Sequence, residues 1–240
     1  MRLLSFWIGL LILALAGAAH GQSLSLATSQ TYPRSTLAGD GFQDLILKEA
    51  CRRLGLSLRT DHVSSERALA NANEGIDDGV YARVAGLEGQ YANLVMVPEK
   101  VAEFTYLAFT ANPDIAVPDW KSLCGFEVGI VTGLKILEKH LTGCPSLTKV
   151  RDPEALFDML EHGRIEVAVI DGLEGREILN RRGSSRIRAL APALTRLDMY
   201  VYLNKARADL VPKMAQVLAV MKADGTFQSL IDTVTKRGRP

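Results

Sequence analysis

The run from Glu166 to Gly172, with the sequence EVAVIDG, constrains the fold more than any other stretch of this chain. Its central residues, 167–170, are all apolar and mostly β-branched. An apolar run without polar alternation is typical of a parallel strand that is buried on both faces. The run ends abruptly in Asp171, so we expect this carboxylate at the carboxyl end of the strand, where open α/β sheets hold their ligands.

Strand and helix patterns alternate along the rest of the chain and form two series. The first series has predicted strands at 23–29, 56–63 and 77–83 and predicted helices at 42–54 and 64–75. The second series has predicted strands at 126–131, 147–150 and 167–170 and predicted helices at 134–141, 153–162 and 173–182. Short connections between alternating strands and helices predict right-handed crossovers and mostly parallel sheets.

Extended segments connect the two series. One runs from Val101 to Ala111 between them, and a second strand-like segment from Ile187 to Leu203 returns after the second series. A long amphipathic helical region, 210–235, closes the chain and is interrupted around Gly225. This order predicts two lobes joined by two crossing strands, with a cleft between the lobes that favours a small ligand.

The amino terminus has the features of a secretory signal peptide. Arg2 is its only charged residue, the segment from Leu3 to Ala16 is apolar, and Ala19 and Gly21 supply small residues where a signal peptidase cleaves. We therefore predict a signal peptide at 1–21, cleavage after Gly21 and a periplasmic protein. An uncleaved amino-terminal anchor is the alternative.

The charge balance and the histidines exclude several classes of function. The chain has 28 basic and 27 acidic residues, and loss of Arg2 with the signal would leave it formally neutral. Nucleic-acid binding needs a basic face, so no nucleic-acid partner is expected. None of the histidines His62, His140 and His162 has a Ser or Cys nearby in the sequence in a pattern typical of a catalytic pair. We therefore expect a monomer that is not an enzyme and needs no cofactor.

Three cysteines remain after the signal. Cys124 and Cys144 each precede a predicted strand, and neighbouring parallel strands bring their starts close together. In an oxidising compartment this placement predicts a Cys124–Cys144 disulfide, with two buried free thiols as the alternative. Cys51 lies on the apolar side of a predicted helix and is expected in the core. No His or second Cys stands at ligand spacing from these cysteines, so no metal site is expected.

Four short motifs resemble one known family. They are GFQDL at 41–45, RLGL at 53–56, NEGIDDG at 73–79 and MKADGTF at 221–227. With these motifs the chain resembles, over nearly its whole mature length, the bacterial extracellular solute-binding proteins of family 3. The resemblance implies a periplasmic binding protein type II-like fold in which two α/β lobes close on a small polar ligand by a hinge motion, without chemistry on the ligand.

The resemblance also implies lobe boundaries and partners. Lobe I is expected at 22–106 plus 199–240, and lobe II at 107–198. The implied partner is an ABC permease that takes up the ligand. The alternative is a sensory or accessory module that signals to a membrane sensor instead of feeding a transporter.

The resemblance places candidate ligand contacts at two positions. Asp171 stands where amino-acid-binding members hold the ligand ammonium group, although it could instead cap the helix after it. Tyr32 stands in a loop that often offers an aromatic platform, although it could be packed in the core.

The pattern departs from the family where the ligand carboxylate is held. The expected arginine is absent near Gln90, and Leu134 stands where a hydroxyl residue is expected. Arg83 is the nearest substitute for anion capture, with surface pairing to Asp78 or Glu88 as the alternative. Thr132 and Gly133 could hold an anion at a helix start or form only a tight turn. An amino-acid-like compound, an organic acid and an amine all stay open as ligands.

Overall fold

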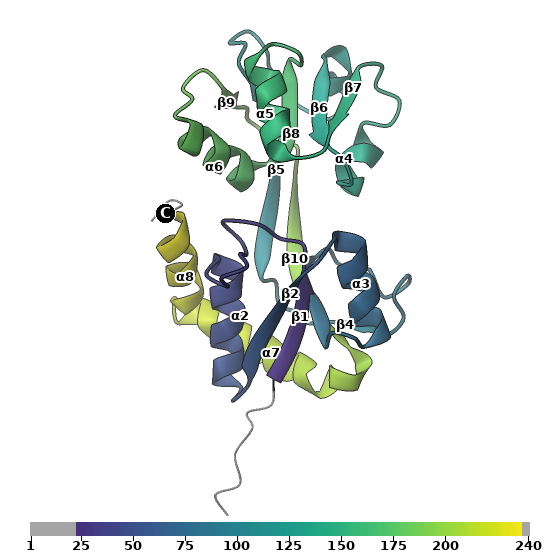
Figure 1. Cartoon of the computed structure of the whole chain (residues 1–240), viewed down its shortest axis with the longest axis vertical. Coiled ribbons are helices and arrows are strands. Elements are labelled where there is room, and N and C mark those ends of the chain that lie inside the picture. The colour runs from purple at the N-terminus through teal and green to yellow at the C-terminus, as the bar shows by residue number, and fades with distance from the viewer. Residues whose placement is uncertain (1–22, 237–240) are drawn as a thin grey trace, which may run out of the picture.

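The structure is a computed structural model, and it describes residues 23–236. The predicted signal peptide and its cleavage site lie outside these residues. Figure 1 shows two lobes, one above the other, connected by the long strands β5 (Ala102–Thr110) and β10 (Thr195–Asn204). The predicted two-lobed α/β fold with two crossing strands is therefore confirmed.

The lower lobe contains both ends of the described chain. Its strands are β1 (Ser23–Thr28), β2 (Ser57–His62), β3 (Gly79–Arg83) and β4 (Leu94–Met96). Its helices are α2 (Phe42–Arg53), α3 (Ser65–Glu74), the short 3-10 helix η3 (Lys205–Leu210), α7 (Val211–Ala223) and α8 (Thr226–Thr235). Strand β1 lies between β2 and β3 and pairs with both in parallel.

The upper lobe repeats the alternation of strands and helices. Its strands are β6 (Val128–Val131), β7 (Leu147–Val150), β8 (Val167–Asp171) and β9 (Arg188–Ala189). Its helices are the 3-10 helix η2 (Ser122–Gly125), α4 (Lys135–His140), α5 (Pro153–Glu161) and α6 (Gly172–Arg182). Strand β8 pairs in parallel with β6 and antiparallel with β5, and all its residues are buried. The expectation of a strand buried on both faces is confirmed.

The sheet is continuous through the connection between the lobes. Its strand order is β2-β1-β3-β10-β5-β8-β6-β7. Strand β10 pairs antiparallel with β3 in the lower lobe and with β5 near the upper lobe. Because the two strands that connect the lobes run antiparallel to their neighbours, the sheet is mixed in its middle and parallel only within each lobe.

The segment that the sequence predicts as one strand, 187–203, is two strands in the structure. β9 and β10 both pair antiparallel with β5, and Pro192 lies in the bend between them. Proline has no backbone N–H to donate to a ladder and so interrupts a strand. Across the break the chain continues in the same direction along β5, first as β9 in the upper lobe and then as β10 towards the lower lobe.

The predicted disulfide between Cys124 and Cys144 is present, with Cα atoms 4.7 Å apart. It connects η2 with the segment after α4. Cys51 is a free and fully buried cysteine on α2, as predicted.

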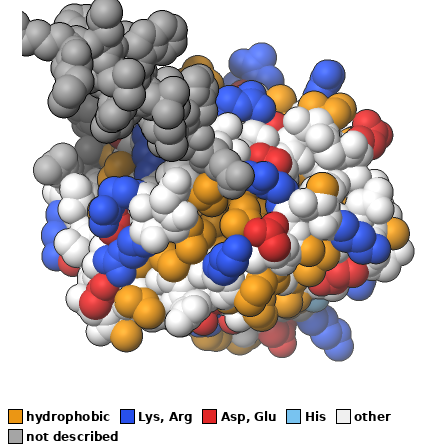
Figure 2. Space-filling view, turned by 90° about the horizontal axis from the view of Figure 1, so that it is seen from below, with side chains coloured by type: hydrophobic (Ala, Val, Ile, Leu, Met, Phe, Trp, Pro, Cys, Tyr) orange, Lys and Arg blue, Asp and Glu red, His pale blue; other side chains and the backbone are white. Residues whose placement is uncertain are grey.

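The lower face of the molecule mixes charges of both signs. Figure 2 shows a hydrophobic area there, surrounded by Lys and Arg side chains and by Asp and Glu side chains. This mixture agrees with the formal charge of +1. In the described residues, no helix combines the length and the apolar character that a membrane span requires.

Candidate functional site

A cavity of about 590 Å³ lies between the lobes and is lined by residues of both. Gln30 and Arg83 reach it from the lower lobe, and Gly133 and Asp171 reach it from the upper lobe. Parallel strands β1, β3 and β8 all end at its walls, as expected for ligand sites of α/β sheets. The volume is in the range of small-molecule sites.

Asp171 joins three parts of the chain. Its Oδ1 atom accepts hydrogen bonds from the backbone N–H groups of Leu173 (3.0 Å) and Glu174 (3.2 Å), so it caps α6. Its Oδ2 atom accepts one from the N–H of Thr105 (3.2 Å) on β5. Arg34 Nη2 lies 2.7 Å from Oδ1, in an ion pair of which both side chains are only 6% exposed. Asp171 is therefore both a helix cap and part of the cavity wall.

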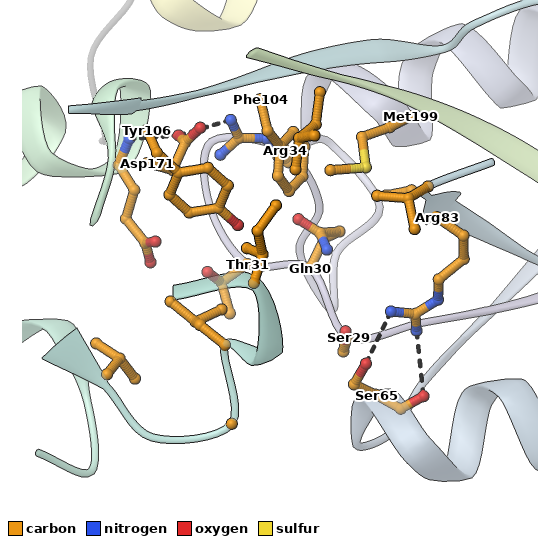
Figure 3. Close-up of a pocket in the computed structure, with 18 of the residues that line it drawn as sticks. Ser29, Gln30, Thr31, Arg34, Ser65, Arg83, Phe104, Tyr106, Asp171 and Met199 are labelled. Carbon is orange, nitrogen blue, oxygen red and sulfur yellow. Dashed lines mark hydrogen bonds and ion pairs between the residues drawn. The ribbon is translucent and has the colours of Figure 1, made fainter. Parts of the chain in front are cut away.

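Arg34 reaches Asp171 from the loop between β1 and α2. Its guanidinium lies over the Phe104 ring, 4.0 Å from the ring centroid, an arrangement that favours a cation. Figure 3 shows Arg34, Phe104 and Asp171 together on one side of the cavity. The pair connects the lower lobe with the upper lobe across 137 residues of sequence.

The loop that carries Arg34 is fixed by a buried polar cluster. Ser35 Oγ lies 2.7 Å from Asp44 Oδ1, 2.8 Å from His62 Nε2 and 2.9 Å from the Tyr81 hydroxyl. The Ser35–His62 contact is one that sequence proximity did not indicate. Ser35 is completely buried and its hydroxyl is hydrogen-bonded to Asp44, so the serine is anchored in place. The cluster holds the loop and thereby positions Arg34.

Arg83 forms neither of the surface ion pairs considered from the sequence. Its Nη1 atom donates to Ser65 Oγ (2.8 Å), and within residues 23–236 it lies against no carboxylate. The side chain is buried, its Nε atom has no hydrogen-bond partner among the described residues, and burial lowers the pKa of Arg83 to about 10. The preceding residue, Ala82, has φ of 58°, a left-handed conformation that is uncommon for residues with a Cβ atom. A buried guanidinium after a strained residue is a candidate anion site.

Glu174 and Tyr106 complete the wall near Asp171. Burial raises the pKa of Glu174 to about 7, with a smaller contribution from the charge of Asp171 that is opposed by Arg34. Its side chain is half-buried, and its carboxylate accepts no hydrogen bond from the described chain. Tyr106 faces Asp171 across the β5–β8 pairing, and burial raises the pKa of its hydroxyl to about 12.

The remaining sequence candidates lie at or beyond the edge of the cavity. Gly133 lines it, but its N–H donates to Glu138 Oε1 (3.3 Å). Thr132 is exposed and is not part of the lining, and its N–H donates to the carbonyl of Val150. Tyr32 packs against the main core beside its cis peptide bond to Pro33 and borders a second cavity on the lower lobe. The structure thus brings together Asp171, Arg83 and Gly133 at one cavity.

Sequence reasoning missed Arg34, Glu174, Tyr106 and Phe104. Position along the chain held a partial signal for two of them. Arg34 follows the first parallel strand and Glu174 follows the strand that ends at Asp171, so both stand near the ligand-binding edge of the sheet. Tyr106 and Phe104 gave no such signal, because they lie within a crossing strand whose register is set by tertiary pairing.

Residues 23–236 contain no group of three or more His, Cys, Asp or Glu side chains placed to hold a metal ion. The polar groups of the cavity are guanidinium, carboxyl, hydroxyl and amide groups, which suit hydrogen bonding to a small organic molecule.

Comparison with known proteins finds the same fold. No family model matches the chain. An uncharacterised protein of Shewanella oneidensis is 28% identical over 192 residues, which are 77% of this chain and 72% of that protein.

Solved structures of binding proteins superpose on most of the chain. An ancestral arginine-binding protein bound to arginine has a TM-score of 0.71 at 16% identity and covers 88% of this chain and 97% of its own. An arginine transport system periplasmic binding protein from Legionella pneumophila has a TM-score of 0.69 at 15% identity, covering 89% and 99%. A histidine kinase sensor domain with similarity to periplasmic binding proteins has a TM-score of 0.71 at 13% identity, covering 87% and 93%.

The chain therefore has the two-lobed fold of periplasmic binding proteins, and the resemblance expected from its motifs is confirmed at the level of the fold. The structures it resembles are repeatedly binding proteins for amino acids, at low identity, as for a divergent chain of this kind.

Proposed function

We propose that this protein is a periplasmic solute-binding protein that captures a small polar ligand between its two lobes for ABC-type uptake. The observation that carries the proposal is the cavity between the lobes, to which both lobes contribute polar side chains. The lobes of the proposal are 22–106 plus 199–240 and 107–198. The protein performs no chemistry on the ligand and closes on it because the ligand binds the closed arrangement more tightly than the open one.

A sensory role is the second candidate. It is favoured by the likeness to a histidine kinase sensor domain, which covers 87% of the chain at the same TM-score as the ancestral arginine-binding protein. In this role the closed protein would contact a membrane sensor. Uptake of the labelled ligand by cells with and without the gene separates the two, because only the transport role predicts loss of uptake on deletion.

Ligand binding is tested by thermal stabilisation of the pure protein with amino acids, organic acids, amines and small peptides. A ligand that binds only the folded protein must raise the melting temperature, by a free energy of about 2.7 kcal/mol at a hundredfold excess over Kd. We expect at least one class to do so, and isothermal titration calorimetry then measures one site per chain.

The variant Thr31→Trp tests whether the ligand binds in the cavity between the lobes. Thr31 is exposed and lines the cavity, and Figure 3 shows it in the middle of the site, so an indole there fills the ligand space. The matched control is Ser229→Trp, at an exposed position on α8. We expect the first variant to lose ligand-induced stabilisation and the second to keep it. Equal stabilisation of both variants would place the ligand elsewhere and contradict the proposal.

A further inference from the structure

The acidic group that faces the cleft from β8 is largely occupied by the protein itself. Asp171 Oδ1 accepts hydrogen bonds from Arg34 Nη2 and from two backbone N–H groups, and Oδ2 accepts one from the N–H of Thr105. A carboxylate has about four acceptor positions, so at most one position on Oδ2 remains for a ligand. The negative charge of Asp171 is also balanced by the positive charge of Arg34, and both side chains of this ion pair are buried.

The groups that remain free in the cavity are mostly donors. Arg34 Nε is buried and makes no hydrogen bond within the described chain, and Arg83 is a buried guanidinium that no described carboxylate neutralises. Arg151 also lines the cavity, but its side chain is 90% exposed and is paired with the half-buried Asp152, so it does not add to these free groups. A buried guanidinium without an anion is an unfavourable arrangement in the free protein, and a ligand carboxylate would remove that deficit.

The walls between these donors are apolar. Figure 3 shows Arg34 and Arg83 on opposite sides of the cavity, with Phe104 and Met199 between them along one wall. Other apolar residues of the lining include Leu69, Leu87, Val131, Leu134, Ile136 and Leu197. Such walls favour a ligand with an apolar body and disfavour a second charged group of the ligand.

We propose that the cleft binds an organic anion that has an apolar body and no cationic group, and that Arg34 supplies the cation for Asp171 that a zwitterionic ligand would otherwise bring. Arg83 is the main contact for the ligand carboxylate. This inference rests on the proposed function, since it names the ligand class of the same cleft.

Glu174 provides the competing arrangement. Its carboxyl group lines the cavity without a partner in the described chain, so it could hold a ligand ammonium group in place of Asp171. In the proposed arrangement Glu174 takes up a proton when the anion binds. Burial already raises its pKa to about 7, Arg34 opposes that rise and Asp171 adds to it. The two arrangements make opposite predictions for Glu174→Gln. Anion binding persists or strengthens in the first, and ligand binding is lost in the second.

The inference is tested with pairs of compounds that differ by one α-ammonium group. The pairs are 3-phenylpropionate and phenylalanine, 4-methylpentanoate and leucine, and pentanoate and norvaline, each assayed by thermal shift and then by calorimetry. For the wild-type protein we expect at least one deaminated compound to bind about tenfold or more tightly than its amino acid, a difference of about 1.4 kcal/mol. If an amino acid binds as tightly as its deaminated partner in the best-binding pair, the inference is overturned.

Variants at Arg34 and Asp171 test whether the Arg34–Asp171 ion pair causes the preference for ligands without an ammonium group. Arg34→Met keeps the apolar contact with Phe104 and frees Asp171, so the preference shifts about tenfold towards the amino acid. Arg34→Lys keeps the cation and therefore the preference of the wild type. If Arg34→Met does not fold, Asp171→Asn serves instead. It retains the acceptor for the α6 cap and removes the anion, so binding of the deaminated compound is kept or strengthened, and a loss of that binding overturns the inference.

Failure of the inference and failure of the proposed function give different results. If none of the six compounds binds at millimolar concentration while an amine or a peptide does, the anion inference is wrong and the cleft is still a ligand site. If no compound of any class stabilises the protein, both are wrong.

Discussion

At the scale of single residues, one ion pair decides the electrostatics of the cleft. Without Arg34, the carboxylate of Asp171 at the end of the buried strand would have no positively charged partner. Once the pair has formed, Glu174 is left as the carboxyl without a partner among the described residues of the cavity wall. Burial disfavours the charged form of Glu174, so ionisation of this group destabilises the folded protein relative to the unfolded chain.

Glu174→Gln tests this cost as a function of pH. Burial raises the pKa of Glu174 from 4.5 to about 7, so the folded protein holds the proton more tightly than the unfolded chain. The protonated form of Glu174 stabilises the folded protein fully below the pKa of the unfolded chain, and this contribution is lost as the pH rises through 7. We expect the variant to be more stable than the wild type at pH 8, by about 1–3 kcal/mol for a half-buried group, and similar at pH 4. Urea unfolding at both pH values measures the difference.

Glu177→Gln on the same helix is the control for loss of one carboxylate from α6, because Glu177 does not line the cavity. A difference between Glu174→Gln and the wild type that is the same at pH 4 and pH 8 would contradict the raised pKa of Glu174.

At the scale of elements, the junction of β8 and α6 builds one side of the site. The helix begins directly after the strand, and Asp171 caps it with two hydrogen bonds. Two glycines, Gly172 and Gly175, allow α6 to lie close against β5. A Cβ atom on Gly175 would lie 2.4 Å from Phe109 Cζ, and one on Gly172 would lie 2.6 Å from Leu107 Cδ1. The close packing of α6 on β5 holds Glu174 against the cavity.

Gly175→Ala should therefore destabilise the protein although alanine favours helix. The methyl group would displace the fully buried Phe109, which packs edge-on against Phe157 with ring centroids 5.5 Å apart. Overpacking of this kind costs about 1–3 kcal/mol, against a gain in helix propensity of about 1 kcal/mol. The midpoint of urea unfolding measures the net loss.

Gly89→Ala is the matched control, because a Cβ atom there would meet nothing within 4 Å. We expect that variant to unfold at the same urea concentration as the wild type. If Gly175→Ala were more stable than the wild type, the close approach of α6 to β5 would not be a packing constraint.

At the scale of the whole molecule, two kinds of connection hold the lobes in place. Strands β5 and β10 join them covalently and pair with each other over the segment that links the lobes. The Arg34–Asp171 pair joins them a second time, without covalent bonds, at the wall of the cavity. In the proposed hinge motion about these strands, this pair biases the lobes towards the closed arrangement.

Arg34→Met should shift the free protein towards an open arrangement. Breaking a buried ion pair by removing one partner costs up to about 3–5 kcal/mol, and here Asp171 keeps three backbone donors, so we expect about 2–3 kcal/mol. Small-angle X-ray scattering should then give a larger radius of gyration for this variant than for the wild type. Arg34→Lys, which can keep the pair, should retain the wild-type value. An unchanged radius for Arg34→Met would show that the pair does not hold the lobes together.

The sequence by itself determined most of the elements and their order, because each depends on a local pattern. The apolar run before Asp171 predicted β8, and the positions of Cys124 and Cys144 predicted their disulfide. The division at Pro192 was missed because the residues on either side of it are individually compatible with strand.

Only the tertiary structure decided which side chains share the cleft. Arg34 and Asp171 stand 137 residues apart, and no local pattern relates them. They meet because the parallel strands β1 and β8 belong to different lobes whose ligand-binding edges face each other across the crossing strands. For the same reason the sequence identified Asp171 as a group at the cleft but left open what it contacts, and the structure placed an arginine of the protein there.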